Sequence, residues 1–116
     1  MTVGFDKYSL EDGSIKKLEV VNADIRVHVQ NWRDEVDILV FRDVIGFEGY
    51  SVINASLSHG AETTSDPFLA NCSTIGEEAE ADFRCFSFFS AWTDFVILKI
   101  IARSFELASE GKEQNP

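Results

Sequence analysis

The clearest pattern in the sequence is a strict alternation of apolar and polar residues. Ile25, Val27 and Val29 alternate with polar residues, and a second alternation begins at Val36, after a turn over 31–34. Period-two alternation places every second side chain on the same face of a β-strand. The two segments are therefore predicted to form an antiparallel hairpin with one buried face.

Four further segments are predicted to be strands. Residues 16–21 and 50–57 carry apolar residues between turn signals, and 82–91 is rich in phenylalanine. Residues 95–105 are apolar on both faces and rich in β-branched side chains, which favours one long buried strand. A buried helix is the alternative for 95–105, because periodicity alone does not separate the two for a short apolar run.

One short helical turn is predicted within the long polar segment 58–80. Asp66 is a good helix N-cap, Pro67 suits the first helical position, and Asn71 suits the left-handed end. The acidic stretch 74–80 is predicted to be an exposed turn, and the glycines at 46 and 49 a bend or bulge.

The length of 116 residues fits a single domain, predicted to span 1–107, with a polar, flexible tail over 108–116. Together the segments predict a mainly β protein. We expect five to six antiparallel strands and one short helical turn, arranged as a sandwich or a curved, half-open barrel.

The negative charge is concentrated in the middle of the sequence. The net charge is −10, and no Lys or Arg lies between Arg42 and Arg84. The acids in this segment are predicted to form one anionic, partner-binding surface: Asp43, Glu48, Glu62, Asp66, Glu77, Glu78, Glu80 and Asp82.

This charge pattern narrows the classes of partner. A nucleic-acid-binding protein needs a basic stripe, and anionic membranes also repel carboxylates, so neither partner is expected. A basic protein is the favoured partner, because complementary charge speeds encounter. Solubility alone is the alternative explanation of the acidity. Nothing in the sequence predicts the oligomeric state.

The pattern W-x-D-x-V-x-[IL] occurs twice, beginning at Trp32 and at Trp92. Both copies fall where a hairpin turn is predicted, and Asp can fix a turn by bonding to local backbone amides. Shared turn chemistry explains the repeat. The alternative is that the two Trp side chains are offered to a partner, since Trp is enriched at binding hot spots.

The sequence carries no recognisable catalytic or metal-binding motif. His28 and His59 lack the spacing of a metal pair, and Ser58 is expected to point away from His59 along an extended chain. The acids at 77–82 lack the spacing of a calcium loop. We therefore expect no enzyme activity, cofactor or metal.

Cys72 and Cys85 are the only cysteines in the sequence. They are predicted to be buried thiols in a reducing compartment, with a structural disulfide between them as the alternative. The sequence has no apolar run long enough to span a membrane, and 1–17 lacks the apolar core of a signal peptide. We expect a cytoplasmic protein.

The segment 86–102, FSFFSAWTDFVILKIIA, resembles the closing hairpin of small bacterial β-proteins of the toxin-immunity type, and a looser similarity reaches back to FRDV at 41–44. The resemblance implies a β-sandwich or curved sheet and neutralisation of a toxin. It identifies no binding residue.

The sequence thus predicts a non-catalytic protein-binding module, in its most specific form an immunity-type inhibitor of a basic partner. Two alternatives stay open. One is a small-ligand-binding or enzymatic β-barrel with a Phe-lined pocket and His59 or His28 at its mouth. The other is an oligomeric scaffold joined by strand edges.

Overall fold

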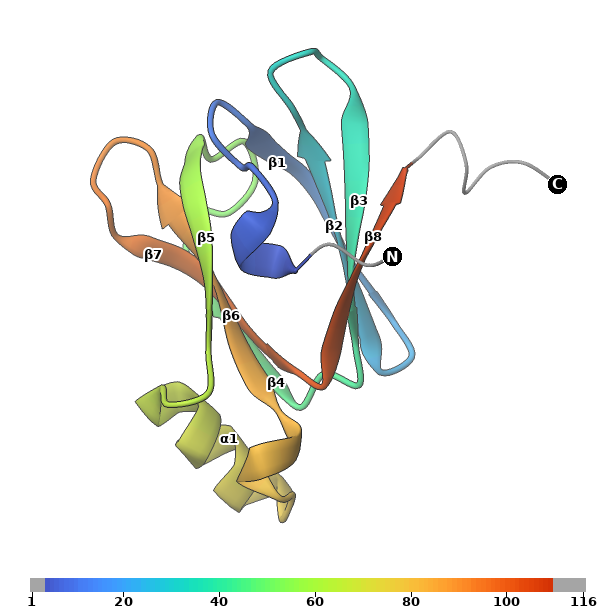
Figure 1. Cartoon of the computed structure of the whole chain (residues 1–116), viewed down its shortest axis with the longest axis vertical. Helices are drawn as coiled ribbons and strands as arrows, with labels where there is room; N and C mark the ends of the chain where they lie inside the picture. Colours follow the sequence, from blue (N-terminus) through green and yellow to red (C-terminus); the bar gives the residue numbers. More distant parts are fainter. Residues whose placement is uncertain (1–3, 110–116) are drawn as a thin grey trace, which may run out of the picture.

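The protein consists of two four-stranded antiparallel sheets, shown in Figure 1. The computed structural model describes residues 4–109. The first sheet has the order β1–β2–β3–β8 and the second the order β4–β7–β6–β5. The strands are β1 (Ser14–Val21), β2 (Asp24–Gln30), β3 (Val36–Arg42), β4 (Gly46–Gly49), β5 (Leu57–Thr63), β6 (Arg84–Ser90), β7 (Val96–Ala102) and β8 (Ser104–Ser109).

The predicted fold class is confirmed, with eight strands instead of five or six. The hairpin predicted from alternation is β2–β3. In β2 every second residue is buried, whereas β3 is buried on both faces over 38–41. The other elements are α1 (Pro67–Gly76) and two short 3-10 helices, η1 (Phe5–Lys7) and η2 (Glu80–Asp82). No helix in residues 4–109 is long and apolar enough to cross a membrane.

The chain passes between the sheets at a corner formed by two short bends. Residues 43–45 lead from β3 to β4, and Arg103 leads from β7 to β8. The bends are bonded to the neighbouring strands, because Arg103 N–H donates to Arg42 O and Ile45 N–H to Ile101 O, both at 2.9 Å. Above this corner the sheets splay apart, and η1 lies between them (Figure 1).

Phenylalanines fill the space between the sheets. Phe5, from η1, is fully buried and makes edge-on contacts with Phe41, Phe86, Phe88 and Phe105, at centroid distances of 5.1 to 5.7 Å. Edge-on packing is the arrangement that aromatic rings prefer. The Phe-rich strands therefore pack onto a ring from the N-terminal segment, where the sequence predicted no helix or strand.

Two strand predictions were wrong. The segment 95–105 is two strands in different sheets, because the chain turns at Arg103 and β8 pairs with β3. Residues 50–56 are a loop, because Ser51 and Asn54 have left-handed backbones, with φ of 49° and 68°, which a strand does not tolerate. The predicted bend at 46–49 is the short strand β4.

The helix and the tail also differ from prediction. Asp66 caps α1 by accepting the Phe68 N–H at 2.8 Å, and Pro67 opens the helix, as predicted. The helix continues past Asn71 to Gly76 and ends at Glu77, whose φ is 55°. Residues 108 and 109, predicted to begin the tail, are the last of β8. The rest of that tail, 110–116, lies outside the described residues.

Candidate protein-binding surface

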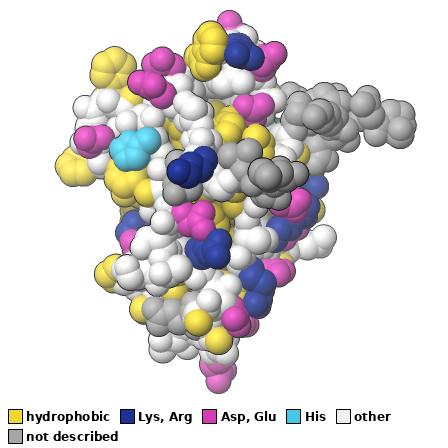
Figure 2. All heavy atoms as spheres, viewed as in Figure 1, with side chains coloured by type: hydrophobic (Ala, Val, Ile, Leu, Met, Phe, Trp, Pro, Cys, Tyr) yellow, Lys and Arg dark blue, Asp and Glu magenta, His cyan; other side chains and the backbone are white. Residues whose placement is uncertain are grey.

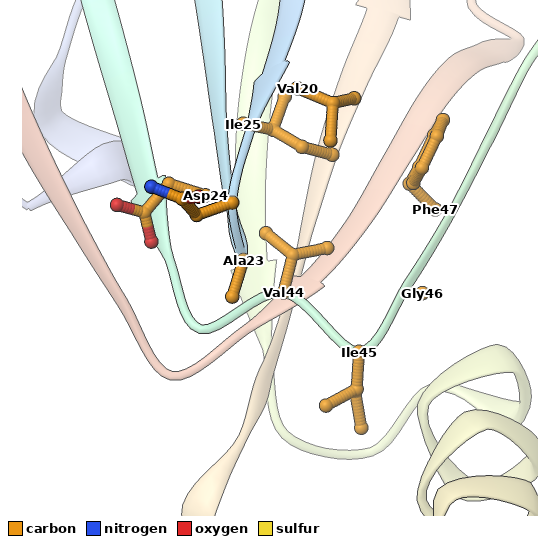
Figure 3. Close-up of a pocket in the computed structure, with 9 residues that line it drawn as sticks. Val20, Ala23, Asp24, Ile25, Val44, Ile45, Gly46 and Phe47 are labelled. Atoms are coloured by element: carbon orange, nitrogen blue, oxygen red, sulfur yellow. The ribbon is translucent and has the colours of Figure 1, made fainter.

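The most distinctive surface feature is an apolar groove between the β1–β2 hairpin and β4. It has a volume of about 180 Å³. In Figure 3, the side chains of Val20, Val44 and Phe47 converge on the space between the two sheets, whereas Ile45 points away from it, toward α1. The groove therefore lies directly beside the corner where the chain changes sheet.

The groove is the hydrophobic core continued to the surface. Along the inner face of β1, Ile15 is fully buried, Leu18 is half-buried and Val20 is 61% exposed. On the other side, Val44 packs against the core, and Phe47, on β4, is 46% exposed. Core-facing side chains are thus uncovered because neither sheet reaches across the opening.

The strands on either side of the groove are edge strands. In the described sheets β4 pairs with β7 alone, and β1 pairs with β2 apart from a single bridge between Ser14 and Ser56. An edge strand presents backbone N–H and C=O groups that can pair with another chain. The groove therefore combines apolar side chains with available backbone groups.

More exposed apolar residues continue along the same side of the molecule. Tyr50 follows β4, and its N–H bonds to Ile97 O at 2.9 Å. Ile53 lies next in the loop, beside Asn54, whose N–H bonds to Ile15 O at the start of β1. Tyr50 and Ile53 are both more than half exposed. Neither residue lines the groove itself; both lie in the loop that joins β4 to β5.

Four of the eight predicted acidic residues pair with bases from elsewhere in the sequence. Figure 2, which views the molecule as in Figure 1, shows acidic and basic side chains next to one another. The ion pairs are Asp43 and Asp82 with Arg103 (3.4 and 3.7 Å), Glu62 with Arg84 (2.8 Å) and Asp66 with Lys99 (3.1 Å). The negative charge of the segment is therefore partly neutralised within the fold.

Near the groove the carboxylates still outnumber the bases. Arg103 is shared by two carboxylates, and Arg42 is likewise shared by Asp24 and Glu106, both at 2.8 Å. Lys99 binds Asp66 and lies opposite Glu48 on β4. Two of these three bases, Arg42 and Arg103, thus each pair with two carboxylates. The hydrogen bond from Arg42 lowers the pKa of the Asp24 carboxyl, which stays ionised at neutral pH.

The remaining predicted site residues lie in two places. Glu77 and Glu78 are exposed at the end of α1, and Glu80 opens η2. Trp32 and Trp92 are 66% and 85% exposed on the β2–β3 and β6–β7 turns, which Figure 1 shows at the end of the molecule away from α1. The acids near α1 and the two Trp residues therefore do not form one surface.

The expectation that Ser58 and His59 point apart was wrong. A bulge in β5 between Leu57 and His59 brings Ser58 Oγ within 2.9 Å of His59 Nδ1. His59 also stacks on Phe89, with a centroid distance of 4.3 Å, and lines an open cleft of about 410 Å³ beside Tyr8. His28 contacts Glu19 at 2.7 Å across the β1–β2 pair.

The cysteines are both buried and both free, so the disulfide alternative is not formed. Burial raises the pKa of both thiols, which keeps them protonated and unreactive. Within the described part of the chain, no group of three or more His, Cys, Asp or Glu residues is arranged to hold a metal ion.

Sequence reasoning missed the groove. The available signal was the apolar pair Val20–Val21 at a strand end, with Phe47 between two turn-like glycines. Comparison with known proteins gives no further guide, because no family model, curated protein or solved structure matches the chain.

Proposed function

We propose that the protein is a non-catalytic protein-binding module whose contact surface is the open side between β1 and β4. One observation carries this proposal: the core face continues, uncovered, to the edges of β1 and β4, where within residues 4–109 the first residues of β1 are the only ones bonded on that side. A folded protein gains by covering such a surface, because each Å² of apolar area removed from water contributes about 25 cal/mol.

A basic partner suits this surface. Arg42 and Arg103 each pair with two carboxylates, and the whole chain has a net charge of −10. Complementary charge speeds the encounter and disfavours wrong partners. The resemblance of 86–102 to immunity-type proteins favours a basic toxin as this partner.

The proposal is tested by selecting binders from a random dodecapeptide display library with the full chain as bait. Peptides that bind should be mapped on the ¹⁵N-labelled chain by NMR. We expect the largest shifts at 20–25 and 44–50. Binding should weaken in Phe47→Ala and should be unchanged in Phe95→Ala, a matched loss of an exposed ring on the β6–β7 turn.

Two outcomes would contradict the proposal. One is a library that yields no binder. The other is a set of binders that map away from the groove and are equally sensitive to Phe47→Ala and Phe95→Ala. Phe47 is 46% and Phe95 72% exposed, so neither variant opens a cavity in the buried core and both should stay folded, which circular dichroism checks.

A further inference from the structure

From the geometry of the groove we infer how the partner binds and what it is made of. A short extended segment, with alternating apolar and basic residues, adds to the free edge of β4 as a fifth strand of its sheet. This inference rests on the proposed function, because it specifies the occupant of the same open side.

The main chain of β4 has hydrogen-bonding groups available for this addition. In an antiparallel pair, successive residues point their N–H and C=O groups alternately toward the neighbouring strand and away from it. Tyr50 N–H bonds to Ile97 O of β7. Counting back along β4, Phe47 and Gly49 therefore direct their backbone groups away from β7, toward the open side. The four residues of β4 set the length of the pairing.

The two faces of β4 differ, and this difference determines the composition of the added segment. Phe47 faces the groove with Val20 and Val44. Gly46 faces α1, because a Cβ at Gly46 would lie 2.3 Å from Cys72 Sγ, and Glu48 shares that face. A neighbouring strand continues both faces. Its inward side chains therefore enter the apolar groove, and its outward side chains lie beside Glu48.

The charges favour basic residues at the outward positions. Glu48 lies opposite Lys99, but Lys99 Nζ already contacts both carboxylate oxygens of Asp66, at 3.1 and 3.3 Å. Glu48 therefore lies across from a lysine whose ammonium group is already held by another carboxylate. A Lys or Arg of the added strand beside Glu48 would restore the balance, because opposite charges on neighbouring strands attract.

The probe for this inference is an acetylated and amidated octapeptide of alternating lysine and valine. It is titrated at low salt into the ¹⁵N-labelled full chain. We expect saturable shifts at 44–50. A lysine–serine peptide and a glutamate–valine peptide should each bind about tenfold more weakly. Glu48→Gln should weaken binding about threefold, and Glu78→Gln, at the end of α1, should leave it unchanged.

Main-chain pairing is tested with two further peptides, N-methylated at every valine or at every lysine. Only one set of amides faces β4, so one methylated peptide should lose binding about tenfold and the other should keep it. If the two methylated peptides bind equally well, the strand addition is wrong. The proposed function still holds in that case, provided that the library peptides map to the groove. If the library peptides also fail to bind, both the strand addition and the proposed function are wrong.

A second copy of the chain is the rival occupant of the groove. Sedimentation equilibrium of the free protein distinguishes it. A dimer that is lost in Phe47→Ala would overturn the inference, because the edge of β4 would then be occupied by another β4. A monomer at the concentrations of the titration supports it.

Discussion

At the scale of single residues, the backbone conformation of the aspartate in each copy explains the repeated W-x-D pattern. Asp34 and Asp94 both have left-handed backbones, with φ of 62° and 60°. The predicted role of Asp in bonding the turn amides falls instead to its neighbours, since Asn31 Oδ1 accepts from two amides and Thr93 Oγ1 from one. The pattern therefore marks a position that must adopt a positive φ, which Asp tolerates.

This reading predicts the effect of substitutions at Asp94. Asp94→Ala should lower the free energy of unfolding by about 1 kcal/mol, because alanine keeps the Cβ but lacks the short polar side chain that makes the left-handed region tolerable for Asp. Asp94→Gly removes the Cβ and should be neutral or slightly stabilising. Urea unfolding of the two variants measures the difference. Equal stability of the alanine and glycine variants would show that backbone strain does not decide this position.

At the scale of elements, the most important feature is η1, which the sequence did not reveal. Phe5 contributes the ring at the centre of the core, and β5 approaches it closely, because a Cβ at Gly60 would lie 2.6 Å from that ring. The N-terminal segment is therefore part of the hydrophobic core and does not merely precede it.

Removing the Phe5 ring from the core should strongly destabilise the protein. Phe5→Ala is expected to lower the free energy of unfolding by about 3–5 kcal/mol, the range for a phenylalanine removed from a packed core. Gly60→Ala should also destabilise, by about 1–3 kcal/mol, through overpacking against the same ring. The double variant should lose less free energy of unfolding than the two single variants together, because Phe5→Ala makes room for the new methyl group. Strict additivity in denaturant unfolding would argue against the contact.

The corner between the sheets gives a prediction about pH. The Arg42 hydrogen bond lowers the pKa of Asp24 in the folded state, so the bond stabilises the protein above the unfolded pKa of about 4. That stabilisation is lost as the pH falls below 4 and passes the lowered folded pKa. Asp24→Asn should therefore be about 1 kcal/mol less stable than the parent at pH 7.

Thermal or urea unfolding between pH 7 and pH 2.5 measures this dependence. The gap in the free energy of unfolding between Asp24→Asn and the parent should close as the Asp24 carboxyl of the parent is protonated. The matched control is Glu78→Gln, an exposed acid at the end of α1. A gap that keeps the same size across the pH range would show that the ion pair is not its source.

These elements show what the sequence could and could not predict. The β2–β3 hairpin was predictable because alternation is a local property of the chain. The split of 95–105 was not, because the segment has no Gly, Pro, Asn or Asp to mark a turn. The bend at Arg103 depends on its bond to Arg42, which is distant in sequence. The groove was hidden for the same reason. Val20 and Phe47 look like ordinary core residues until both sheets are in place.

At the scale of the whole molecule, folding redistributes the charge that the sequence concentrates between 43 and 82. The bases that pair with these acids, Arg84, Lys99 and Arg103, all come from the C-terminal third of the chain. No local reading could place them. The charge excess left near the groove arises from sharing, in which one base serves two carboxylates.

This sharing predicts different effects on peptide binding for the loss of two arginines that carry the same formal charge. Arg103→Gln frees Asp43 and Asp82 beside the groove, whereas Arg33→Gln removes a base that lies over Trp32 on the distant β2–β3 turn. Both variants raise the net negative charge by one. If local charge governs binding, Arg103→Gln should bind the lysine–valine peptide about threefold more tightly at low salt, and Arg33→Gln should match the parent.

Raising the salt to about 1 M should abolish the gain, because screening then acts within about 3 Å. Arg103 also stacks over Phe83, 4.8 Å from the ring centroid, so Arg103→Gln will be less stable and its folding must be confirmed before titration. An equal gain in both variants would show that the probe responds to net charge alone. No gain in Arg103→Gln would place Asp43 and Asp82 outside the contact surface, and the partner would then be held by the apolar groove and the β4 edge without their help.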